Sequence, residues 1–189
     1  MSLRKLPLLL AAALLVATIT VGIVRAQGGT VADFTVQKNG GGSTSLSAYN
    51  GQKAIVVIFV NSACPFTRLY QERLTALNSA YSSRGVEFLF INVPINLDAN
   101  EGSGASLASF SDEGGAASAA LGVMKTTEAV VLQPAGAGFA VRYRGAIDDN
   151  PQIASGVQQP YLRQVLDNVL AGRPAGVADK RAAGCLIKR

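Results

Sequence analysis

Two apolar runs separated by a helical segment constrain the fold of this 189-residue chain most strongly. Residues 53–60 (KAIVVIFV) and 86–92 (VEFLFIN) are rich in β-branched and aromatic side chains and have the length of typical strands. Between them, apolar residues recur at helical spacings from Pro65 until Arg84-Gly85 ends the pattern. Continuous apolar runs of this kind are typical of strands buried on both faces, so the sequence predicts a parallel β-α-β unit with a right-handed crossover. The helix positions expected to face the core are Leu69, Leu74, Leu77 and Tyr81.

Shorter elements are expected on either side of this unit. Ahead of it we expect a linker at 27–32, a strand at 33–37, a loop at 39–43 and a helical turn at 45–49. Behind it we expect a loop at 98–115 with a short helix near 106–110, a helix at 116–121, strands at 128–132 and 139–144 joined by a turn at 134–138, and a helix at 161–170. This order is the thioredoxin arrangement: an α/β fold in one domain, with a central mixed sheet flanked by helices. In it, the residues after the first buried strand lie at the carboxyl edge of the sheet, where sites in open α/β folds form.

The N-terminal segment has the layout of a secretory signal peptide. Arg4 and Lys5 precede an almost wholly apolar run, and residues 24–26 (VRA) offer small residues at the positions used for cleavage. We therefore expect residues 1–26 to be a signal peptide and residues 27–189 to be the domain, located in the periplasm or secreted. An uncleaved membrane anchor is the alternative, because the run is close to the ~20 residues that a spanning helix needs.

Composition excludes several classes of function. Residues 1–26 carry three cations and no acids, so the net charge of +5 falls to +2 in the remaining 163 residues. No basic stripe interleaved with aromatic residues is left, which argues against nucleic-acid binding. The chain has no histidine, which excludes His-based triads, Cys-His dyads and the commonest zinc and copper ligands. We expect no metal and no cofactor.

Cys64 is the residue that most suggests chemistry. It stands in NSACPFTRLY, residues 61–70, at the point where the first buried strand gives way to the helix. A thiol at a helix N-terminus is exposed to unpaired N–H groups and the positive end of the macrodipole, which favour the thiolate and lower its pKa. Pro65 fits the first helical turn, and Arg68 adds a cation one turn in. A small buried hydrophobic side chain is the competing interpretation of the same cysteine.

Several stretches together resemble one family. The matching stretches are Ala63-Cys64-Pro65 with Arg68, Tyr70 and Glu72; residues 126–132; residues 143–149; Leu162 and Leu166 with residues 171–172; and Gly184-Cys185 within residues 184–188. Over about residues 31–188 the chain resembles the thioredoxin-like redoxins of the alkyl hydroperoxide reductase/thiol-specific antioxidant group. More narrowly, it is similar to an exported branch with a single active-site Cys-Pro and a C-terminal Gly-Cys.

The chain also departs from the family pattern at the expected site. Thr67 stands where a Cys-x-x-Cys motif has its second cysteine, so local dithiol exchange is excluded at this turn. Asn61 stands where peroxiredoxins have a threonine, and Lys125 is the cation nearest to the Thr126 turn. Thr127 replaces the usual cis-proline, and we expect a trans bond there because a cis non-proline bond costs about 3 kcal/mol.

The second cysteine, Cys185, lies 121 residues after Cys64. An even number of cysteines in an exported chain is consistent with a disulfide, and the tail after the last helix is long enough to fold back over the sheet edge. Cys185 is then either the resolving thiol for Cys64 or half of a structural disulfide. A packed tail thiol without a partner is the third interpretation.

Two functional hypotheses follow. In the first, the protein is an exported thiol oxidoreductase in which Cys64 attacks a peroxide or a protein disulfide and an external thiol supplies the electrons. Asn61, Pro65, Thr67, Lys125, Thr126 and Thr127 form the pocket, and Cys185 is the candidate resolving thiol. In the second, the protein is a redox-silent thioredoxin-like module that binds or assembles an exported partner, and its membrane contact is limited to the N-terminal segment if that segment is uncleaved.

Overall fold

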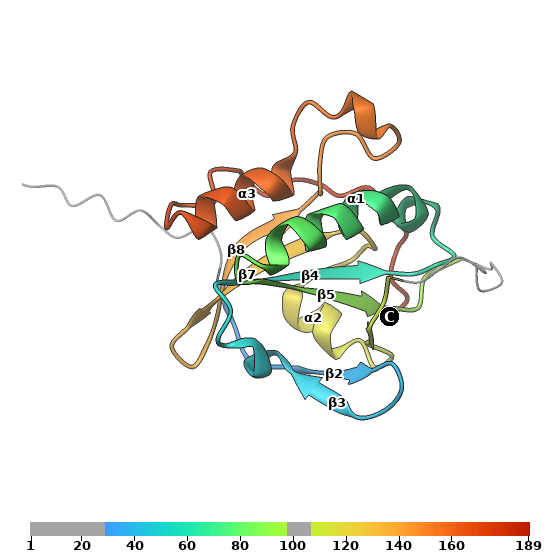
Figure 1. Ribbon diagram of the computed structural model, residues 1–189. Helices are drawn as coiled ribbons and strands as arrows, with labels where there is room; N and C mark the ends of the chain where they lie inside the picture. Colours follow the sequence, from blue (N-terminus) through green and yellow to red (C-terminus); the bar gives the residue numbers. More distant parts are fainter. Residues whose placement is uncertain (1–28, 98–106) are drawn as a thin grey trace, which may run out of the picture.

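The computed structural model describes residues 29–97 and 107–189, which form one mixed sheet with helices on both faces (Figure 1). The strands lie in the order β1-β8-β7-β4-β5-β6-β2-β3. Their bounds are β1 Thr30–Val31, β2 Thr35–Lys38, β3 Ser43–Ser45, β4 Ala54–Val60, β5 Val86–Asn92, β6 Phe110–Ser111, β7 Ala129–Ala135 and β8 Gly138–Gly145. The helices are α1 Pro65–Ser82, α2 Ala116–Leu121 and α3 Tyr161–Leu170, with 3-10 turns η1 Leu46–Tyr49 and η2 Ala154–Gly156.

The central β-α-β unit is confirmed. β4 and β5 pair in parallel, from Ala54 opposite Val86 to Val60 opposite Asn92, and α1 connects them. β7 pairs with β4 on its other side and runs antiparallel, which makes the sheet mixed. Every residue of β4 is buried, as its unbroken apolar run predicted. The end of β4 therefore lies in the middle of the sheet, between β5 and β7.

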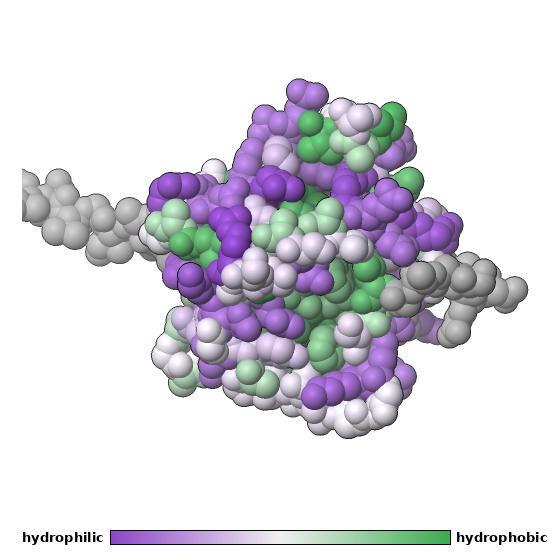
Figure 2. Space-filling view, in the orientation of Figure 1, coloured by the Kyte–Doolittle hydropathy of each residue, from purple (hydrophilic) through white to green (hydrophobic). Residues whose placement is uncertain are grey.

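Alternate side chains of β4 enter two separate cores. Helices α1 and α3 cover one face of the sheet and α2 covers the other, as Figure 1 shows. Val56 and Ile58 pack on the α1/α3 side, whereas Val57 and Phe59 pack on the α2 side. Each such side chain contributes about 1.5–3 kcal/mol on leaving water, so β4 is anchored from both faces. On the face seen in Figure 2, a hydrophobic area lies between α1 and the β2–β3 pair, with hydrophilic residues around it.

One helix position was predicted wrongly. α1 buries Tyr70, Leu74, Leu77 and Tyr81, which follow one another at spacings of three or four residues. Leu69, which was expected on this face, is 46% exposed. It precedes Tyr70 by one residue, a rotation of about 100° around the helix, so both cannot face the core. Tyr70 takes the buried position.

Local pattern also failed at three short segments. The short helix expected near 106–110 is absent from its described part, residues 107–110; residue 106 lies outside the described residues. Phe110 and Ser111 instead form β6, which joins β5 to β2 by completing hydrogen bonds at two strand edges. Thr30 and Val31, expected in a linker, pair with β8 as β1. β7 continues through Pro134–Ala135, so the hairpin turn is shorter than the predicted 134–138.

Most of the remaining elements match their predictions, whereas β3 and η2 were not predicted. η1, α2 and α3 occupy the segments that were expected to be helical, and β7 and β8 form the expected hairpin. The N-terminal segment expected to be a signal peptide lies outside the described residues. Among residues 29–97 and 107–189, no helix combines the length and apolar character needed to cross a membrane.

Candidate active site

Cys64 is the N-cap residue of α1, directly after β4, and is completely buried. The side chain of Asn61 shapes the turn that carries it. Its Oδ1 accepts a hydrogen bond from the N–H of Ala63 at 2.9 Å, and its Nδ2 donates to the carbonyl oxygen of Val93 at 2.8 Å. The N–H of Cys64 donates to the Asn61 carbonyl oxygen at 3.0 Å. Asn61 therefore fixes the turn and ties it to the segment that follows β5.

Thr67, Pro65 and Arg68 complete the start of α1. The N–H of Asn61 donates to Thr67 Oγ1 at 3.4 Å, so the residue that replaces a second cysteine is buried in the turn. Pro65 occupies the first helical position and is exposed. Arg68 donates from Nη1 to the carbonyl oxygens of Ser62 and Ala63, at 3.0 and 3.2 Å. Its positive charge is held against the turn that precedes the cysteine.

The C-terminal residues 182–188, here called the tail, lie beside this turn as an extended segment. Leu186 pairs antiparallel with Lys125, and Ile187 pairs antiparallel with Ile95. Four backbone hydrogen bonds hold the tail from both sides: Thr126 N–H to Cys185 O, Ile187 N–H to Met124 O, Asn96 N–H to Leu186 O and Lys188 N–H to Pro94 O, all at 2.9–3.0 Å. The tail is thus paired like a strand between residues 94–96 and 124–126.

A disulfide joins the tail to the helix. Cys64 and Cys185 are bonded, with their Cα atoms 5.9 Å apart. The pairing that the sequence left open is therefore found, and the interpretation of Cys185 as a thiol without a partner is wrong. Both cysteines of the chain are in this bond.

Thr126 links the two halves of the disulfide. Its Oγ1 lies 3.1 Å from Sγ of Cys64, to which the hydroxyl donates a hydrogen bond. The same oxygen accepts a hydrogen bond from the N–H of Cys185 at 2.9 Å. The Thr126 side chain is completely buried, so one hydroxyl contacts both cysteines without access to bulk water.

Thr127 adopts a backbone conformation that is unusual for its residue type. Its φ is +60°, in the left-handed region, and no cis peptide bond occurs in the described residues, so the predicted trans bond is confirmed. A β-branched residue in this region carries about 1–3 kcal/mol of strain. The N–H of Thr127 donates to Phe59 O at 2.7 Å, and its Oγ1 donates to the carbonyl oxygen of Ala183. This strained turn therefore attaches the tail to the end of β4.

Lys125 lies next to the tail. Its backbone pairs with Leu186, and its Nζ is 3.5 Å from the carbonyl oxygen of Ala182. The structure thus brings Asn61, Thr67, Thr126 and Thr127 around Cys64 and Cys185. Lys125 is directed to the tail backbone, and Pro65 lies on the surface.

Gly184 was not proposed as a site residue, although its position before Cys185 was part of the motif. A Cβ on Gly184 would overlap the carbonyl oxygen of Thr126 and lie 2.9 Å from the carbonyl carbon. A backbone atom cannot move aside as a flexible side chain can. Only glycine therefore allows the tail to approach Thr126 closely enough for the disulfide.

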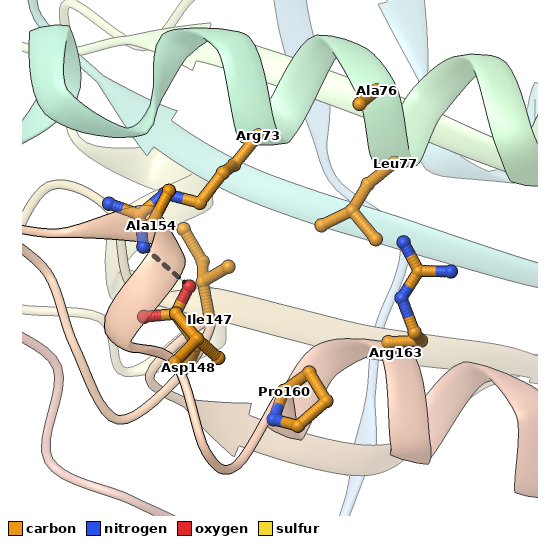
Figure 3. A pocket seen from close by; sticks show the side chains of 9 residues that line it. Arg73, Ala76, Leu77, Ile147, Asp148, Ala154, Pro160 and Arg163 are labelled. Carbon is orange, nitrogen blue, oxygen red and sulfur yellow. Dashed lines mark hydrogen bonds and ion pairs between the residues drawn. The ribbon is translucent and has the colours of Figure 1, made fainter.

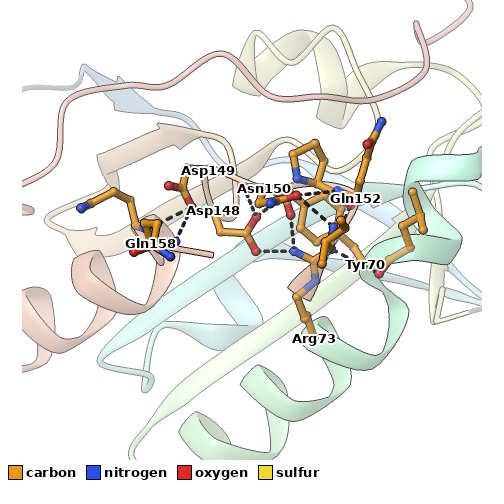
Figure 4. A network of polar contacts seen from close by, with 11 residues as sticks. Tyr70, Arg73, Asp148, Asp149, Asn150, Gln152 and Gln158 are labelled. Carbon is orange, nitrogen blue, oxygen red and sulfur yellow. Dashed lines mark hydrogen bonds and ion pairs between the residues drawn. The ribbon is translucent and has the colours of Figure 1, made fainter. Parts of the chain in front are cut away.

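A buried polar network that the sequence did not reveal lies on the α1 side of the molecule (Figure 4). Asp148 accepts hydrogen bonds from the Tyr70 hydroxyl at 2.9 Å and from Arg73 Nη1 at 2.7 Å. Arg73 also donates to the carbonyl oxygens of Asn150 and Pro151, at 2.8 and 2.9 Å. Burial, followed by the charge of Asp148, raises the pKa of the Tyr70 hydroxyl far above its usual value. The turn at 148–150, in which Asp148 also accepts the N–H of Asn150, is therefore anchored to α1 by an ion pair.

Two cavities flank this network. One of about 210 Å³ lies between α1 and α3, where Leu77 and Arg163 face each other in Figure 3. None of the residues that line it belongs to the tail or to the disulfide. The other, of about 360 Å³, is bordered by Tyr70 and Asp148 and, from the C-terminal region, by Lys180, Arg181 and Ala183. Its wall thus includes the residues through which the chain enters the tail.

A mixed sheet with a half-cystine at the N-terminus of the helix after its central strand defines a thioredoxin-like redoxin. The chain belongs to the AhpC/TSA family, whose model matches residues 28–155. Cys64 lies within the matched region, whereas Cys185 and the tail lie beyond it.

Solved structures of other proteins share this fold. A hypothetical protein from Sinorhizobium meliloti 1021 is 25% identical with a TM-score of 0.72, over 85% of this chain and 93% of that one. An uncharacterized conserved protein from Geobacillus kaustophilus is 26% identical with a TM-score of 0.72, over 86% and 91%. A Chlorobium tepidum protein described as a thiol:disulfide interchange protein shares the fold, at 18% identity and a TM-score of 0.50, over 79% and 97%. No curated protein sequence matches the chain.

Proposed function

We propose that the protein is a thiol-dependent oxidoreductase that cycles between a Cys64/Cys185 dithiol and the Cys64–Cys185 disulfide. The observation that carries this proposal is the disulfide itself, formed between a helix N-terminus and a terminal segment with one buried hydroxyl bonded to both halves. A purely structural disulfide would not need a donor aimed at the sulfur atom of Cys64.

Cys64 is the nucleophile in this proposal. In the reduced protein, the N-terminus of α1 and the Thr126 hydroxyl both favour the thiolate form of Cys64, because each offers a hydrogen-bond donor or a positive dipole to the sulfur. The Arg68 guanidinium on the preceding carbonyls adds positive charge to the same turn. Asn61 and Thr67 hold the turn in place, and Thr127 and Lys125 hold the tail.

Two reactions of this thiolate are compatible with the site. With a hydroperoxide, the thiolate attacks the terminal oxygen and the O–O bond breaks, so that this OH group passes to the sulfur and Cys64 becomes a sulfenic acid. The alkoxide leaves as an alcohol after taking up the proton that the Cys64 thiol released on ionising. The Cys185 thiol then attacks the Cys64 sulfur, water leaves, and the observed disulfide forms. With a disulfide substrate, the thiolate displaces one substrate thiolate, and Cys185 displaces the other from Cys64.

Either cycle needs an external reductant. Two thiols from that reductant supply two electrons and two protons to regenerate Cys64 and Cys185 as thiols.

We further propose that residues 1–26 direct the protein out of the cytoplasm, into an oxidising compartment in which a disulfide persists. N-terminal sequencing of the mature protein tests this, and a mature chain that begins at Gln27 is expected.

Alkylation of the reduced, folded protein by iodoacetamide tests the assignment of the nucleophile. Cys64 in the Cys185→Ser variant should react at a pH well below 8, whereas Cys185 in the Cys64→Ser variant should react as an ordinary thiol of pKa about 8.5. Equal rates for the two thiols across pH would remove Cys64 from the role of nucleophile.

A redox-silent binding or assembly module is the second candidate. The complete burial of Cys64 and the pairing of the tail on both sides favour it, because a substrate has no direct route to the sulfur in the oxidised protein. The disulfide would then act only as a cross-link, worth about 4–5 kcal/mol for a loop of this length in the chain-entropy model. A disulfide that a thiol reductant opens only after unfolding would favour this candidate.

A further inference from the structure

The tail occupies a position that is built for an extended polypeptide. The tail seat, formed by the backbones of residues 94–96 and 124–126, contributes a donor and an acceptor from each side. Strand addition of this kind obtains its affinity from main-chain hydrogen bonds, which are the same for any sequence. The disulfide then joins the segment to Cys64 at one defined position along the seat.

Three features of the seat select the side chains around the joined cysteine. The position before the cysteine must be glycine, because a Cβ there would overlap the Thr126 carbonyl oxygen. The residue after the cysteine points outward, since Leu186 is 51% exposed. The next residue is held in the core on the α2 side of the sheet, where Ile187 is 6% exposed.

Exposed apolar side chains remain at the ends of the seat while the tail is in place. Leu97 follows one edge and is 47% exposed, and Met124 begins the other and is 56% exposed. Both side chains directly adjoin the seat, so a partner segment longer than the tail would pass beside them.

We propose that the tail seat is the substrate-binding site for a protein partner whose reactive cysteine lies in an extended segment of the form Gly-Cys-x-aliphatic. The tail then fills the seat when no partner is bound, and the partner displaces it. This proposal rests on the proposed function, since it requires Cys64 to be a competent thiol. The tail is held by isolated bridges outside the named strands, so it can leave the seat without opening the pairing of the central sheet.

The partner would react with Cys64 by thiol–disulfide exchange. In the reduced protein the tail leaves the seat, and the Cys64 thiolate attacks the partner cysteine of a disulfide. The S–Cys64 bond forms, the partner disulfide breaks, and the second partner cysteine leaves as a thiolate. The tail then returns, Cys185 attacks the Cys64 sulfur, and the first partner cysteine leaves as a thiol after gaining a proton.

A pair of peptides tests this selectivity on the full-length chain carrying Gly184→Ala and Cys185→Ser. In this variant the tail cannot enter the seat, and Cys64 is the one remaining thiol. The first peptide has the sequence of residues 182–188, with its cysteine activated as a pyridyl disulfide. Its twin has alanine in place of the glycine. Release of thiopyridone measures attack by Cys64, and reaction of each peptide with glutathione corrects for intrinsic reactivity.

The glycine peptide is expected to react at least about tenfold faster than its twin, the ratio that corresponds to losing two or three backbone hydrogen bonds. Equal rates for the two peptides, with rapid reaction of Cys64 with dipyridyl disulfide, would overturn this proposal and leave the proposed function standing. No reaction of folded protein with dipyridyl disulfide would overturn the proposed function itself. If the double variant does not fold, Cys185→Ser alone, with excess peptide, should give the same preference for glycine.

Discussion

The side-chain hydroxyl of Thr126 lies 3.1 Å from Sγ of Cys64 and accepts the N–H of Cys185 at 2.9 Å. One residue of the loop before β7 thus forms hydrogen bonds with two cysteines that are 121 residues apart in the sequence. The hydrogen bond to the sulfur would stabilise the Cys64 thiolate in the reduced protein, and the hydrogen bond from the Cys185 N–H holds the docked tail. Replacing this hydroxyl therefore tests both parts of the proposed site.

Thr126→Val keeps the shape of the side chain and removes the hydroxyl. In the reduced protein, the alkylation rate of Cys64 near neutral pH should fall by about tenfold, because a hydrogen bond to a charged group contributes about 1.5–3 kcal/mol. Thr75→Val is the matched control on α1, where Thr75 is exposed and its hydroxyl donates to the Gln71 carbonyl oxygen. An alkylation rate that is the same in both variants would contradict the role given to Thr126.

Gly184→Ala should prevent the tail from docking while both cysteines remain present. The added Cβ overlaps the backbone of Thr126, so the fraction of protein with a Cys64–Cys185 disulfide after mild oxidation should fall strongly. Gly114→Ala is the control, because a Cβ at Gly114 meets nothing within 4 Å. Peptide mapping under non-reducing conditions measures the disulfide. Full oxidation of the Gly184→Ala variant would show that the tail does not need this close approach.

The two ion pairs of the described residues should differ greatly in their effect on stability. Arg73→Met leaves the buried Asp148 carboxylate without its cation and should cost about 3–5 kcal/mol of unfolding free energy. Arg84→Met breaks the exposed pair with Asp167 and should cost less than about 1 kcal/mol. Urea denaturation measures both. Similar losses in the two variants would mean that the buried network does not anchor the 148–150 turn.

Tyr70→Phe should give a stability difference that depends on pH. At neutral pH the variant loses the hydrogen bond to Asp148, worth about 1–3 kcal/mol. Folding raises the pKa of Tyr70, so the stability from its protonated hydroxyl is complete below the unfolded-state pKa of about 10 and is lost as pH rises above that value. The difference between wild type and variant should therefore shrink from about pH 9 to pH 11. A difference that grows over this range would contradict the sign of the shift.

Local sequence pattern predicted the parts of the molecule that depend on local physics. The β-branched run of β4, the helical spacing of α1 and the position of Cys64 between them follow from the sequence alone. The pattern failed where a neighbouring strand determines the outcome. β6 exists because β5 and β2 offer open edges on either side of Phe110. The pattern also failed at Leu69, which is exposed because Tyr70, about 100° further around the helix, takes the position that faces the core.

The sequence did not predict the geometry of the candidate site. Cys64, Cys185, Asn61, Thr67, Thr126 and Thr127 do meet, yet their arrangement depends on the tail pairing with residues 94–96 and 124–126. These main-chain hydrogen bonds leave no periodic pattern in seven residues. Gly184 was the one sequence signal for this arrangement, because a glycine beside a cysteine indicates that another backbone segment approaches closely.

Oxidation of the reduced protein tests the central claim most directly. One equivalent of a hydroperoxide or of oxidised glutathione is added to the wild type and to the Cys64→Ser and Cys185→Ser variants, and the products are identified by mass spectrometry. The wild type should form the Cys64–Cys185 disulfide, the Cys185→Ser variant should stop at a Cys64 sulfenic acid or glutathione adduct, and the Cys64→Ser variant should not react on the same timescale. Consumption of both oxidants by the Cys64→Ser variant as fast as by the wild type would contradict the account.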